Sequence, residues 1–440
     1  MCVPPITGRM RPREGAPPVR LSYPRLLGYA LGAFGTGVFA TVPTVLLLYF
    51  CTESLKMAPV LAATVVLLPK LWALVWDPAV GLWSDRAQTA IGRRRPFLLA
   101  GSIGVPLTFF ALFAWPYPQG NAAFVGVALL YFLLTNAYSL FAVPFISIPA
   151  EISEDAAERE RVGAWRIGCA MIGTLIGAGL APMLVRAGGS GRDGYVFMAI
   201  WVSLICCAGM FAAFFATPSA TGTRTAQALS LRQAISILLA ERPFRRLAAA
   251  YVLQLTGVGI VSALTPYWII QVAGRTEDSV GTALGIMLSV TILSTPVWAW
   301  VVRHMGARWV ISVAALFFGV ATLGFLAVPP APVLPSLLLY ALIGFPFAGL
   351  QVGPFALVAH LTHAAGEARG NRAGLFTGVW TASEKLGLAL GPGVAGLGLA
   401  VVGFQAGAPV QSQEALWGLA VLLAAAPSLF VWASLPFVRK

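Results

Sequence analysis

The primary candidates for chemistry are charged residues inside long apolar stretches of the sequence: Asp77, Lys385, Arg166 and Lys70. A charged side chain in the middle of a membrane helix costs at least ~2.5 kcal/mol, so it is retained where it faces a partner or a water-filled space. A single carboxylate can carry a proton or help to ligate sodium, and a cation can compete for it when the ion is absent. We therefore expect Asp77 to be a coupling acid and Lys385 its counter-charge, with Arg166 binding substrate or stabilising a closed state.

The same residues permit a purely structural interpretation. Asp77 could simply neutralise Lys385 or Arg166 and so hold helices together. Lys70 lies two helical turns from Asp77 on the same face, and it could pair with Asp77 or extend towards the membrane surface. Glu384 directly precedes Lys385, so it projects about 100° away around a helix and is not expected to reach the same space.

The residue types that catalysis or metal binding needs do not gather anywhere in the sequence. The five cysteines lack the spacing of metal ligands or of a disulfide framework. The three histidines lie near expected helix ends, and none forms a His-Glu pair on a helix. No nucleophile stands beside a base. We therefore expect no enzyme activity, no metal site and no cofactor other than a coupling ion, H⁺ or Na⁺.

The composition predicts the elements that must position the charged residues. Of 440 residues, 58% are hydrophobic and 10% are charged, against roughly 25% charged in a soluble domain. Apolar runs of about 20 residues or more, enough to cross ~30 Å of hydrocarbon, lie near residues 26–50, 59–83, 96–116, 123–149, 162–186, 195–217, 244–272, 280–302, 309–329, 333–359, 372–400 and 414–436. The sequence thus predicts an all-α membrane protein with twelve transmembrane helices.

The distribution of basic residues predicts the orientation of these helices. Outside the spans, most lysines and arginines fall in the tail and in alternate loops, and the opposite loops hold only Lys56, Arg186, Arg192 and Arg275. Basic segments stay on the cytoplasmic side, so both termini are expected there, in a bacterial inner (plasma) membrane. The same rule explains the net charge of +13, so we expect a lipid bilayer as partner and no nucleic acid.

The longest inner connection divides the chain into two halves of six spans. We expect a disordered cytoplasmic tail at 1–25, an N-terminal six-helix bundle at 26–217, a linker at 218–243 and a C-terminal six-helix bundle at 244–440. The linker contains either an interfacial helix that begins at the N-cap residue Ser230 or a plain connection. A shift of 218 residues lays Asp77-Pro78 on Thr295-Pro296, a weak repeat typical of transporters whose two bundles rock about a central site.

The loop between the second and third spans carries the most specific motif. Gly81-Leu82-Trp83-Ser84-Asp85-Arg86, followed by Gly92-Arg93-Arg94-Arg95, resembles the signature loop of the major facilitator superfamily. We expect the glycine at 81 to let helices approach closely, and the acid and the arginines to pair across the bundle interface in one conformation. The alternative is a basic loop that only sets topology. The predicted conformational gating residues are Gly81, Asp85, Arg86, Arg93, Arg94 and Arg95.

Motifs along nearly the whole chain resemble a narrower family, the glycoside-pentoside-hexuronide:cation symporters, which include the melibiose permeases. They are Trp76-Asp77-Pro78, Gly92-Arg93-Arg94-Arg95-Pro96-Phe97, Val143-Pro144-Phe145 with Glu151, Arg166, and Glu384-Lys385-Leu386-Gly387. The resemblance implies a cation site of two aspartates on helix two and one on helix four. Here Asp77 matches, Ala73 and Ala142 fill the other positions, and Ser139 keeps a hydroxyl. Sodium prefers several oxygen ligands, so proton coupling through Asp77, or no coupling, is favoured over sodium coupling.

The resemblance also implies a sugar site, and this chain departs from it. Where the family has an acidic residue on helix one and a tryptophan on helix four, the chain has Gly37 and Ile146. The remaining lining is aromatic and hydroxylic, which suits a glycoside with an apolar face or an amphiphile, although Trp72 and Trp76 also fit ordinary packing. The predicted substrate-binding residues are Arg166, Trp72, Trp76, Asn136, Tyr138, Thr377, Trp380 and Thr381, and the predicted cation-coupling residues are Asp77, Lys385 and Ser139.

Together these features predict a monomeric secondary active transporter with the major facilitator fold. It would carry a sugar-like or glycoside-like small molecule with protons, or with sodium, by alternating access. The first alternative is a carrier or exporter of a lysolipid-like or drug-like amphiphile on the same fold. A membrane-embedded enzyme would need clustered catalytic groups, and a passive channel or scaffold would not need the charged residues within the spans.

Overall fold

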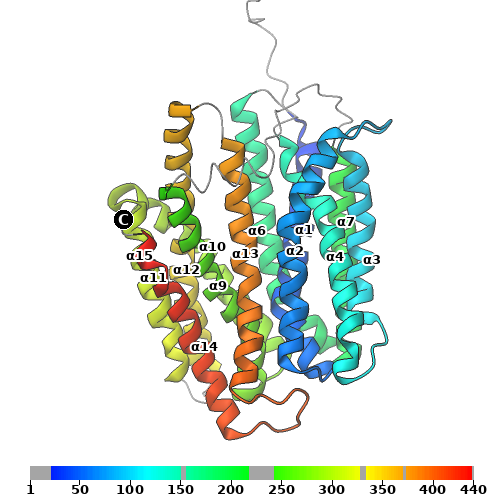
Figure 1. Ribbon diagram of the computed structural model, residues 1–440, viewed down its shortest axis with the longest axis vertical. Helices are drawn as coiled ribbons and strands as arrows, with labels where there is room; N and C mark the ends of the chain where they lie inside the picture. The colour runs from blue at the N-terminus through cyan, green and yellow to red at the C-terminus, as the bar shows by residue number, and fades with distance from the viewer. Residues whose placement is uncertain (1–20, 150–154, 218–241, 328–332, 370–372, 439–440) are drawn as a thin grey trace, which may run out of the picture.

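The computed structural model describes residues 21–149, 155–217, 242–327, 333–369 and 373–438, without the side chains of residues 156, 333 and 359–379. The described residues form long helices joined by short loops (Figure 1). The helices are α1 (Tyr23–Tyr49), α2 (Pro59–Arg86), α3 (Arg95–Ala114), α4 (Phe124–Ser147), α6 (Ala156–Ala187), α7 (Gly191–Ala216), α9 (Arg242–Tyr267), α10 (Glu277–Met305), α11 (Ala307–Leu323), α12 (Val333–Arg369), α13 (Ala373–Val401), α14 (Gln413–Ala433) and the short α15 (Leu435–Val438). Four single turns complete the set: η1 (Phe50–Ser54), η2 (Gly120–Ala123), η3 (Trp268–Val272) and η4 (Gly324–Leu326).

Twelve of these helices are long and apolar enough to cross a membrane. Large apolar side chains also cover their outer faces, as with Leu293 at 76% and Phe215 at 72% exposure. Such a surface would be unfavourable in water but suits hydrocarbon. The prediction of an all-α membrane protein with twelve spanning helices is confirmed, and the chain is an integral membrane protein.

Local sequence signals start these helices. Proline occupies the first turn of α1, α2 and α3, where its missing N–H would have had no partner within the helix. Asp155 caps α6 by accepting a hydrogen bond from the Ala157 N–H, and Ser412 caps α14 through the Ala415 N–H. Each device satisfies or removes a donor that the helix end would otherwise leave open.

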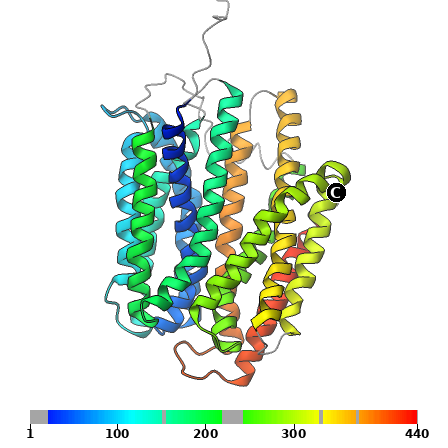
Figure 2. The same cartoon turned by 180° about the vertical axis from the view of Figure 1, so that it is seen from behind.

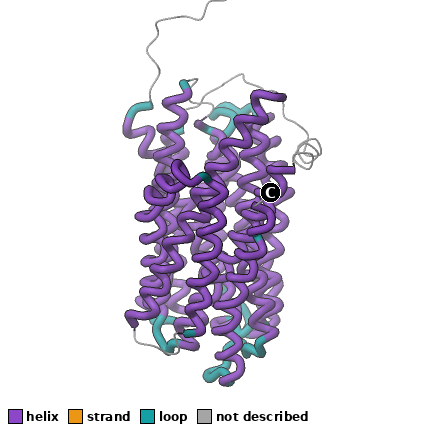
Figure 3. Tube along the Cα trace, turned by 90° about the vertical axis from the view of Figure 1, so that its left-hand side faces the viewer, coloured by secondary structure: helices purple, strands orange, loops and turns teal. Residues whose placement is uncertain are grey.

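The helices pack as two groups that lie side by side (Figures 1 and 2). In the N-bundle, α1 packs against α6 and α7, and α3 packs against α4 and α7; in the C-bundle, α9 packs against α13 and α14, and α12 packs against α10 and α11. The long axes run in the same general direction (Figure 3). The predicted interfacial helix in the linker and all but the last residues of the predicted tail lie outside the described residues.

Because successive helices alternate in direction, the loops fall at two ends. The terminal end carries the start of α1 and the α2–α3 loop, at the top of Figure 1, and α14 runs upwards towards it from the bottom. The far end carries the α1–α2 and α13–α14 loops, at the bottom. These two names are used below.

The main contacts between the bundles join α2 with α13, α6 with α10, and α1 with α9, and α1 also contacts α13. Near the far end these helices approach closely because glycines face the partner. A Cβ added to Gly281 would lie 2.1 Å from the carbonyl oxygen of Gly179, and one added to Gly396 would lie 2.7 Å from the Cβ of Ala63. Backbone contact of this kind tolerates no side chain, so the far-end interface is fixed by sterics.

The far end also shows the internal repeat. The helical turns η1 and η3 are both π-helical and lie 218 residues apart, the offset that aligns the two halves of the sequence. Gln271 donates to the Glu53 carboxylate at 3.0 Å across the same offset. The rings of Tyr49 and Tyr267 meet edge to face at 4.9 Å. We name Tyr49, Thr52, Glu53, Tyr267 and Gln271 the far-end cluster; in it, equivalent residues of the two halves contact each other.

Candidate transport site

The two bundles are joined deep inside the helices by an ion pair. Lys385 of α13 contacts a carboxylate oxygen of Asp77 in α2 through its Nζ atom. The side chains are 16% exposed for Asp77 and 30% exposed for Lys385, so both remain partly accessible. The other Asp77 oxygen, Oδ1, is buried and has no hydrogen-bond partner among the described residues. A buried acceptor without a donor costs about 1–3 kcal/mol, so this oxygen is free to accept a hydrogen bond from a ligand.

The sequence of α2 fixes where this carboxylate stands. Pro78 follows Asp77 directly inside the helix, and proline has no N–H to donate to the carbonyl four residues earlier, at Leu74. The Leu74 carbonyl therefore loses its helical donor within one turn of Asp77. This part of α2 thus offers two kinds of hydrogen-bond acceptor, the Leu74 carbonyl oxygen and the Asp77 carboxylate.

The Lys385 side chain points into the bundle interface. Its Nζ atom lies 6.0 Å from the centre of the Tyr138 ring in α4, a weak cation–π distance. The Tyr138 ring packs on Phe39 of α1 at 4.5 Å. The Asp77–Lys385 pair is therefore directed towards α1 and α4 rather than towards lipid.

Ser139 is not brought to this pair. It is buried, and its hydroxyl donates to the Thr135 carbonyl at 3.1 Å within its own helix. Lys70 is also separate from Asp77, because its Nζ atom donates to the Thr44 hydroxyl at 3.4 Å. Of the polar groups that the sequence associates with Asp77, the structure joins Lys385 to it directly.

Arg166 lies on the N-bundle side of the same interface. It is half-buried in α6, within electrostatic range of Tyr29, Tyr138 and Glu384. It forms no hydrogen bond or ion pair with any residue that the structure describes. A guanidinium with open donors can bind the hydroxyl, carboxylate or phosphate oxygens of a ligand.

Glu384 corrects one expectation from the sequence. Helix geometry suggested that it points away from the space that Lys385 reaches. Instead it lies within electrostatic range of Lys385, Arg166, Tyr138 and Tyr251, which belong to four different helices. A turn of about 100° around α13 leaves Glu384 inside the interface because helices of both bundles surround α13 there.

The predicted aromatic lining divides into satisfied and unsatisfied groups. Trp72 donates to the Asn136 side chain at 3.1 Å, and Asn136 donates in turn to the Phe132 carbonyl at 2.7 Å. These two residues hold α2 to α4. In contrast, the indole N–H of Trp76 is buried without an acceptor in the described part of the chain.

A second unsatisfied indole lies across the interface in the C-bundle. Trp380 is 3% exposed and stacks on Tyr251 at 4.2 Å, and its N–H has no described acceptor. The Tyr251 hydroxyl donates to Gln351 at 2.9 Å. Thr381 makes contacts of its own, and the side chain of Thr377 lies outside the described residues. Sequence reasoning missed Tyr251 and Gln351, since both stand in apolar runs with no motif around them.

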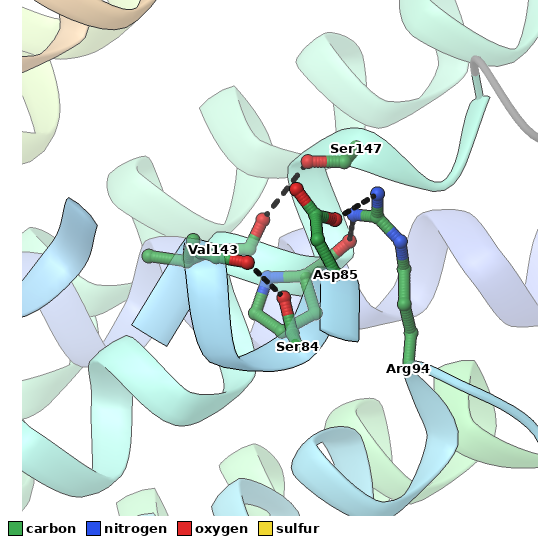
Figure 4. Close-up of polar contacts among 7 residues, drawn as sticks. Ser84, Asp85, Arg94, Val143 and Ser147 are labelled. Atoms are coloured by element: carbon green, nitrogen blue, oxygen red, sulfur yellow. Dashed lines mark hydrogen bonds and ion pairs between the residues drawn. The ribbon is translucent and has the colours of Figure 1, made fainter. Parts of the chain in front are cut away.

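The signature loop closes on its own bundle (Figure 4). Arg94 forms an ion pair with Asp85 at 3.1 Å and also donates to the Pro144 carbonyl of α4 at 3.1 Å. Arg95 lies over the Phe214 ring of α7 at 4.7 Å. The expected pairing of Asp85 across the bundles is therefore replaced, in this conformation, by a contact that ties α2 and α3 to α4.

The glycines and other arginines of this loop have different roles. A Cβ added to Gly81 would meet Val143 at 3.5 Å, an ordinary contact, so the expected need for glycine there is wrong for this conformation. Gly92 does need to be glycine, because its φ of 106° is unfavourable for other residues. Arg86 is exposed at the end of α2, and Arg93 is half-buried and makes contacts of its own.

The family follows from a match over nearly the whole sequence. Residues 28–439 match the family described as MFS/sugar transport protein. The chain belongs to this family. It is therefore a secondary transporter of the major facilitator superfamily and not an enzyme.

Named relatives refine this family assignment. The putative glycoside/cation symporter YagG of Escherichia coli (strain K12) is 25% identical over 91% of this chain and 88% of its own length. The sodium-dependent lysophosphatidylcholine symporter 1-A of Danio rerio is 21% identical over 91% of this chain and 82% of its own. The resemblance to cation symporters of the glycoside family is thus confirmed.

Solved structures support the fold. The crystal structure of the nucleoside transporter NupG superposes with a TM-score of 0.68 at 12% identity, over 95% of this chain and 100% of that one. At this identity the likeness shows the fold alone, which is the major facilitator arrangement of two six-helix bundles.

Proposed function

We propose that this transporter couples proton movement to the symport of a sugar-like or glycoside-like solute by alternating access. The observation that carries the proposal is the Asp77–Lys385 pair. It links helices of opposite bundles deep within the membrane, it is partly accessible, and it leaves one carboxylate oxygen without a partner.

The pair would act as a proton-sensitive latch. While Asp77 is ionised, its attraction to Lys385 holds α2 to α13. A proton on Asp77 removes that attraction and lets the two bundles change their relative position. Lys385 then regains Asp77 when the proton leaves on the other side. Because a proton and Lys385 compete for the same carboxylate, proton binding is coupled to the conformation of the bundles.

The surroundings of Asp77 favour a proton over sodium as the coupling ion. Sodium is best held by several oxygen ligands at once. Asp77 offers one unengaged oxygen, while Ala73 on its own helix and Ala142 on α4 offer none, and the Ser139 hydroxyl donates into its own helix. A proton needs only the single oxygen.

The polar groups left open in the interface favour a solute rich in acceptors. Trp76 and Trp380 each carry a buried indole N–H without an acceptor among the described residues, and Arg166 has open donors. Sugars combine hydroxyl oxygens with apolar ring faces that pack on aromatic side chains. The relative named as a glycoside/cation symporter agrees with this class. Gly37 marks a departure, because a Cβ there would lie 2.4 Å from the Ala170 carbonyl oxygen and no side chain fits.

The proposed orientation places the terminal end in the cytoplasm of a bacterial cell, with the protein acting as a monomer in the inner membrane. The arginines of the α2–α3 loop lie at this end, as basic cytoplasmic loops do. The glycine contacts and the far-end cluster would then close the outer side of the protein. The site would be reached from the cytoplasm in this conformation.

Uptake into proteoliposomes tests the proposal directly. Radiolabelled methyl glycosides should accumulate under an imposed inward proton gradient and not under a sodium gradient alone. Asp77→Asn should abolish accumulation against a gradient while exchange of internal for external glycoside continues. Undiminished uphill uptake by that variant would reject Asp77 as the coupling acid.

The second candidate function is transport of a lysolipid-like amphiphile. The specific observation in its favour is the sodium-dependent lysophosphatidylcholine symporter of Danio rerio, which aligns with 91% of this chain. Lysophosphatidylcholine would then raise the thermal unfolding temperature of the purified protein, because a ligand of the folded state stabilises it, and methyl glycosides would not. The reverse pattern supports the glycoside.

A further inference from the structure

The latch between Asp77 and Lys385 leaves a second acid in the interface unexplained. Glu384 is half-buried in α13, and it forms no hydrogen bond or ion pair with any described residue. Nothing in the family resemblance assigns it a role. A carboxylate at this depth is costly unless it is neutralised by a proton or paired with a cation.

A cation on the opposite bundle, Arg166, acts on Glu384 and also lacks a partner among the described residues. Arg166 of α6 is half-buried and likewise unpaired within the described part of the chain, and its charge acts on Glu384. Arginine cannot lose its proton in a protein. Of the two groups, only Glu384 can therefore gain or lose a proton, and this changes the attraction between them.

Other groups around Glu384 do not neutralise it. Lys385, the adjacent residue, is engaged by Asp77. Tyr138 of α4 and Tyr251 of α9 are within electrostatic range, and both can donate only a neutral hydroxyl, which in Tyr251 already goes to Gln351. Arg166 is thus the one charged group, among the described neighbours of Glu384, that an ionised Glu384 can still gain as a partner.

We propose that Glu384 is a second proton-binding group of the transport pathway, and that its ionised form pairs with Arg166 when the bundles close at the terminal end. This inference rests on the proposed proton-coupled cycle. In the present conformation α6 and α13 are joined to the other bundle through α10 and α2. Arg166 and Glu384 lie ten and eleven residues from the terminal-end starts of these two helices, and the Arg166 charge acts on Glu384. Closure would bring them together, and a proton on Glu384 would oppose it.

The experiment measures the distance between the bundles at the terminal end without any substrate. Spin labels are placed at Gln88, in the α2–α3 loop, and at Met305, at the end of α10, in a background whose native cysteines are replaced; both positions are exposed. Double electron–electron resonance in lipid nanodiscs is recorded from about pH 5 to about pH 9, a range that spans carboxyl titration in buried sites. The protein also carries Asp77→Asn and Lys385→Met, so that the Asp77–Lys385 pair contributes no pH dependence of its own. In this background the distances should shorten as the pH rises, because ionised Glu384 gains Arg166.

Three variants decide the outcome. Glu384→Gln should lose the shift and keep the long distances at every pH. The exchange Arg166→Glu with Glu384→Arg should restore the shift, because the opposite charges are again available. Glu414→Gln, an exposed acid in the first turn of α14, should respond like the background protein. A background protein without a shift, a Glu384→Gln protein that still shifts, or an exchange that fails to restore it would overturn the proposal.

This measurement separates the inference from the proposed function. It requires no glycoside, so a failure of glycoside uptake leaves the distances interpretable. Conversely, loss of proton-driven uptake in Asp77→Asn does not predict whether the spin-label distances shift with pH through Glu384. Each labelled variant is first checked for a monodisperse elution profile and a cooperative thermal transition, so that unfolding is recognised as such.

Discussion

The far end and the middle of the bundle interface are held together by different forces. At the far end, glycine backbones of α6 and α10 touch, and equivalent residues of the two halves meet in the far-end cluster. Deeper in the helices, the contact is the Asp77–Lys385 pair, and Arg166 and Glu384 have no ion-pair partner among the described residues. The first contact depends on shape, and the second depends on charge.

This difference separates two tasks of a transporter. Close packing resists continuous deformation, so the far end is either closed or parted. An ion pair at a partly accessible site can be weakened by one proton, without any steric change. We therefore propose that the far end defines the conformations and that the charged residues determine which one is favoured. Four substitutions test that division, from the largest expected effect to the smallest.

Gly281→Val should have the largest effect because it inserts a branched side chain into backbone contact. A Cβ there would lie 2.1 Å from the Gly179 carbonyl oxygen, so α6 and α10 must part at the far end. We expect transport in proteoliposomes to fall more than about tenfold, since parting by even a few ångströms removes a close-packed contact. Gly285→Ala on the same helix is the matched control, because a Cβ at that position meets nothing within 4 Å. Equal losses in both variants would contradict a steric far-end contact.

Lys385→Met should have the next largest effect because it leaves Asp77 without its cation. An uncompensated, mostly buried carboxylate costs on the order of 3 kcal/mol, so the thermal unfolding temperature at neutral pH should fall by several degrees. Acidification should recover much of the loss, since a proton neutralises Asp77. The double variant with Asp77→Asn should be more stable than Lys385→Met alone. A double variant that is less stable than Lys385→Met would mean that the uncompensated Asp77 carboxylate does not cause the loss of stability.

Gln271→Ala should have a moderate effect limited to the far end. It removes the 3.0 Å hydrogen bond to Glu53, although the Gly407 N–H still donates to that carboxylate. A hydrogen bond contributes about 0.5–1.5 kcal/mol net, so the population with the far end open should rise severalfold in distance measurements by spin labelling. Gln405→Ala is the control at the same end, because the exposed Gln405 is hydrogen-bonded through its backbone to Gln411. An unchanged population in Gln271→Ala would show that this hydrogen bond does not stabilise the closed far end.

Ser139→Ala should have the smallest effect. Its hydroxyl donates to a carbonyl of its own helix, and loss of such a bond changes stability by about 1 kcal/mol or less. Glycoside accumulation under a proton gradient should stay within about twofold of wild type. A strong loss, or a change in the ion requirement, would show that the hydroxyl reaches the coupling ion.

The sequence predicted part of the candidate site because the cost of a buried charge is a property of each residue. That argument named Asp77 and Lys385, which lie 308 residues apart and prove to be in contact. It did not predict that Trp72 and Asn136 satisfy each other, or that Ser139 donates into its own helix. Those outcomes depend on which rotamer and which neighbouring helix each side chain meets, and no local pattern encodes them.

Glu384 and Gly81 also show that a local sequence pattern does not predict which tertiary contacts a residue makes. Helical spacing predicted that Glu384 points away from the space that Lys385 reaches, yet charges on helices of both bundles act on Glu384, because helices surround α13 on more than one side. The motif correctly marked Gly81 within the signature loop, yet the tight contact lies at glycines outside any motif, such as Gly281.

By itself the sequence determined the twelve helices, the internal repeat and the presence of charged groups that need partners. Hydropathy and charge act on each segment through the bilayer, so they can be read without knowing the neighbours. Only the tertiary structure decided which charges pair, which donors remain open and where the bundles touch. Those properties arise from the rotation of each helix and the approach of two bundles distant in sequence, and both are set by packing over the whole molecule.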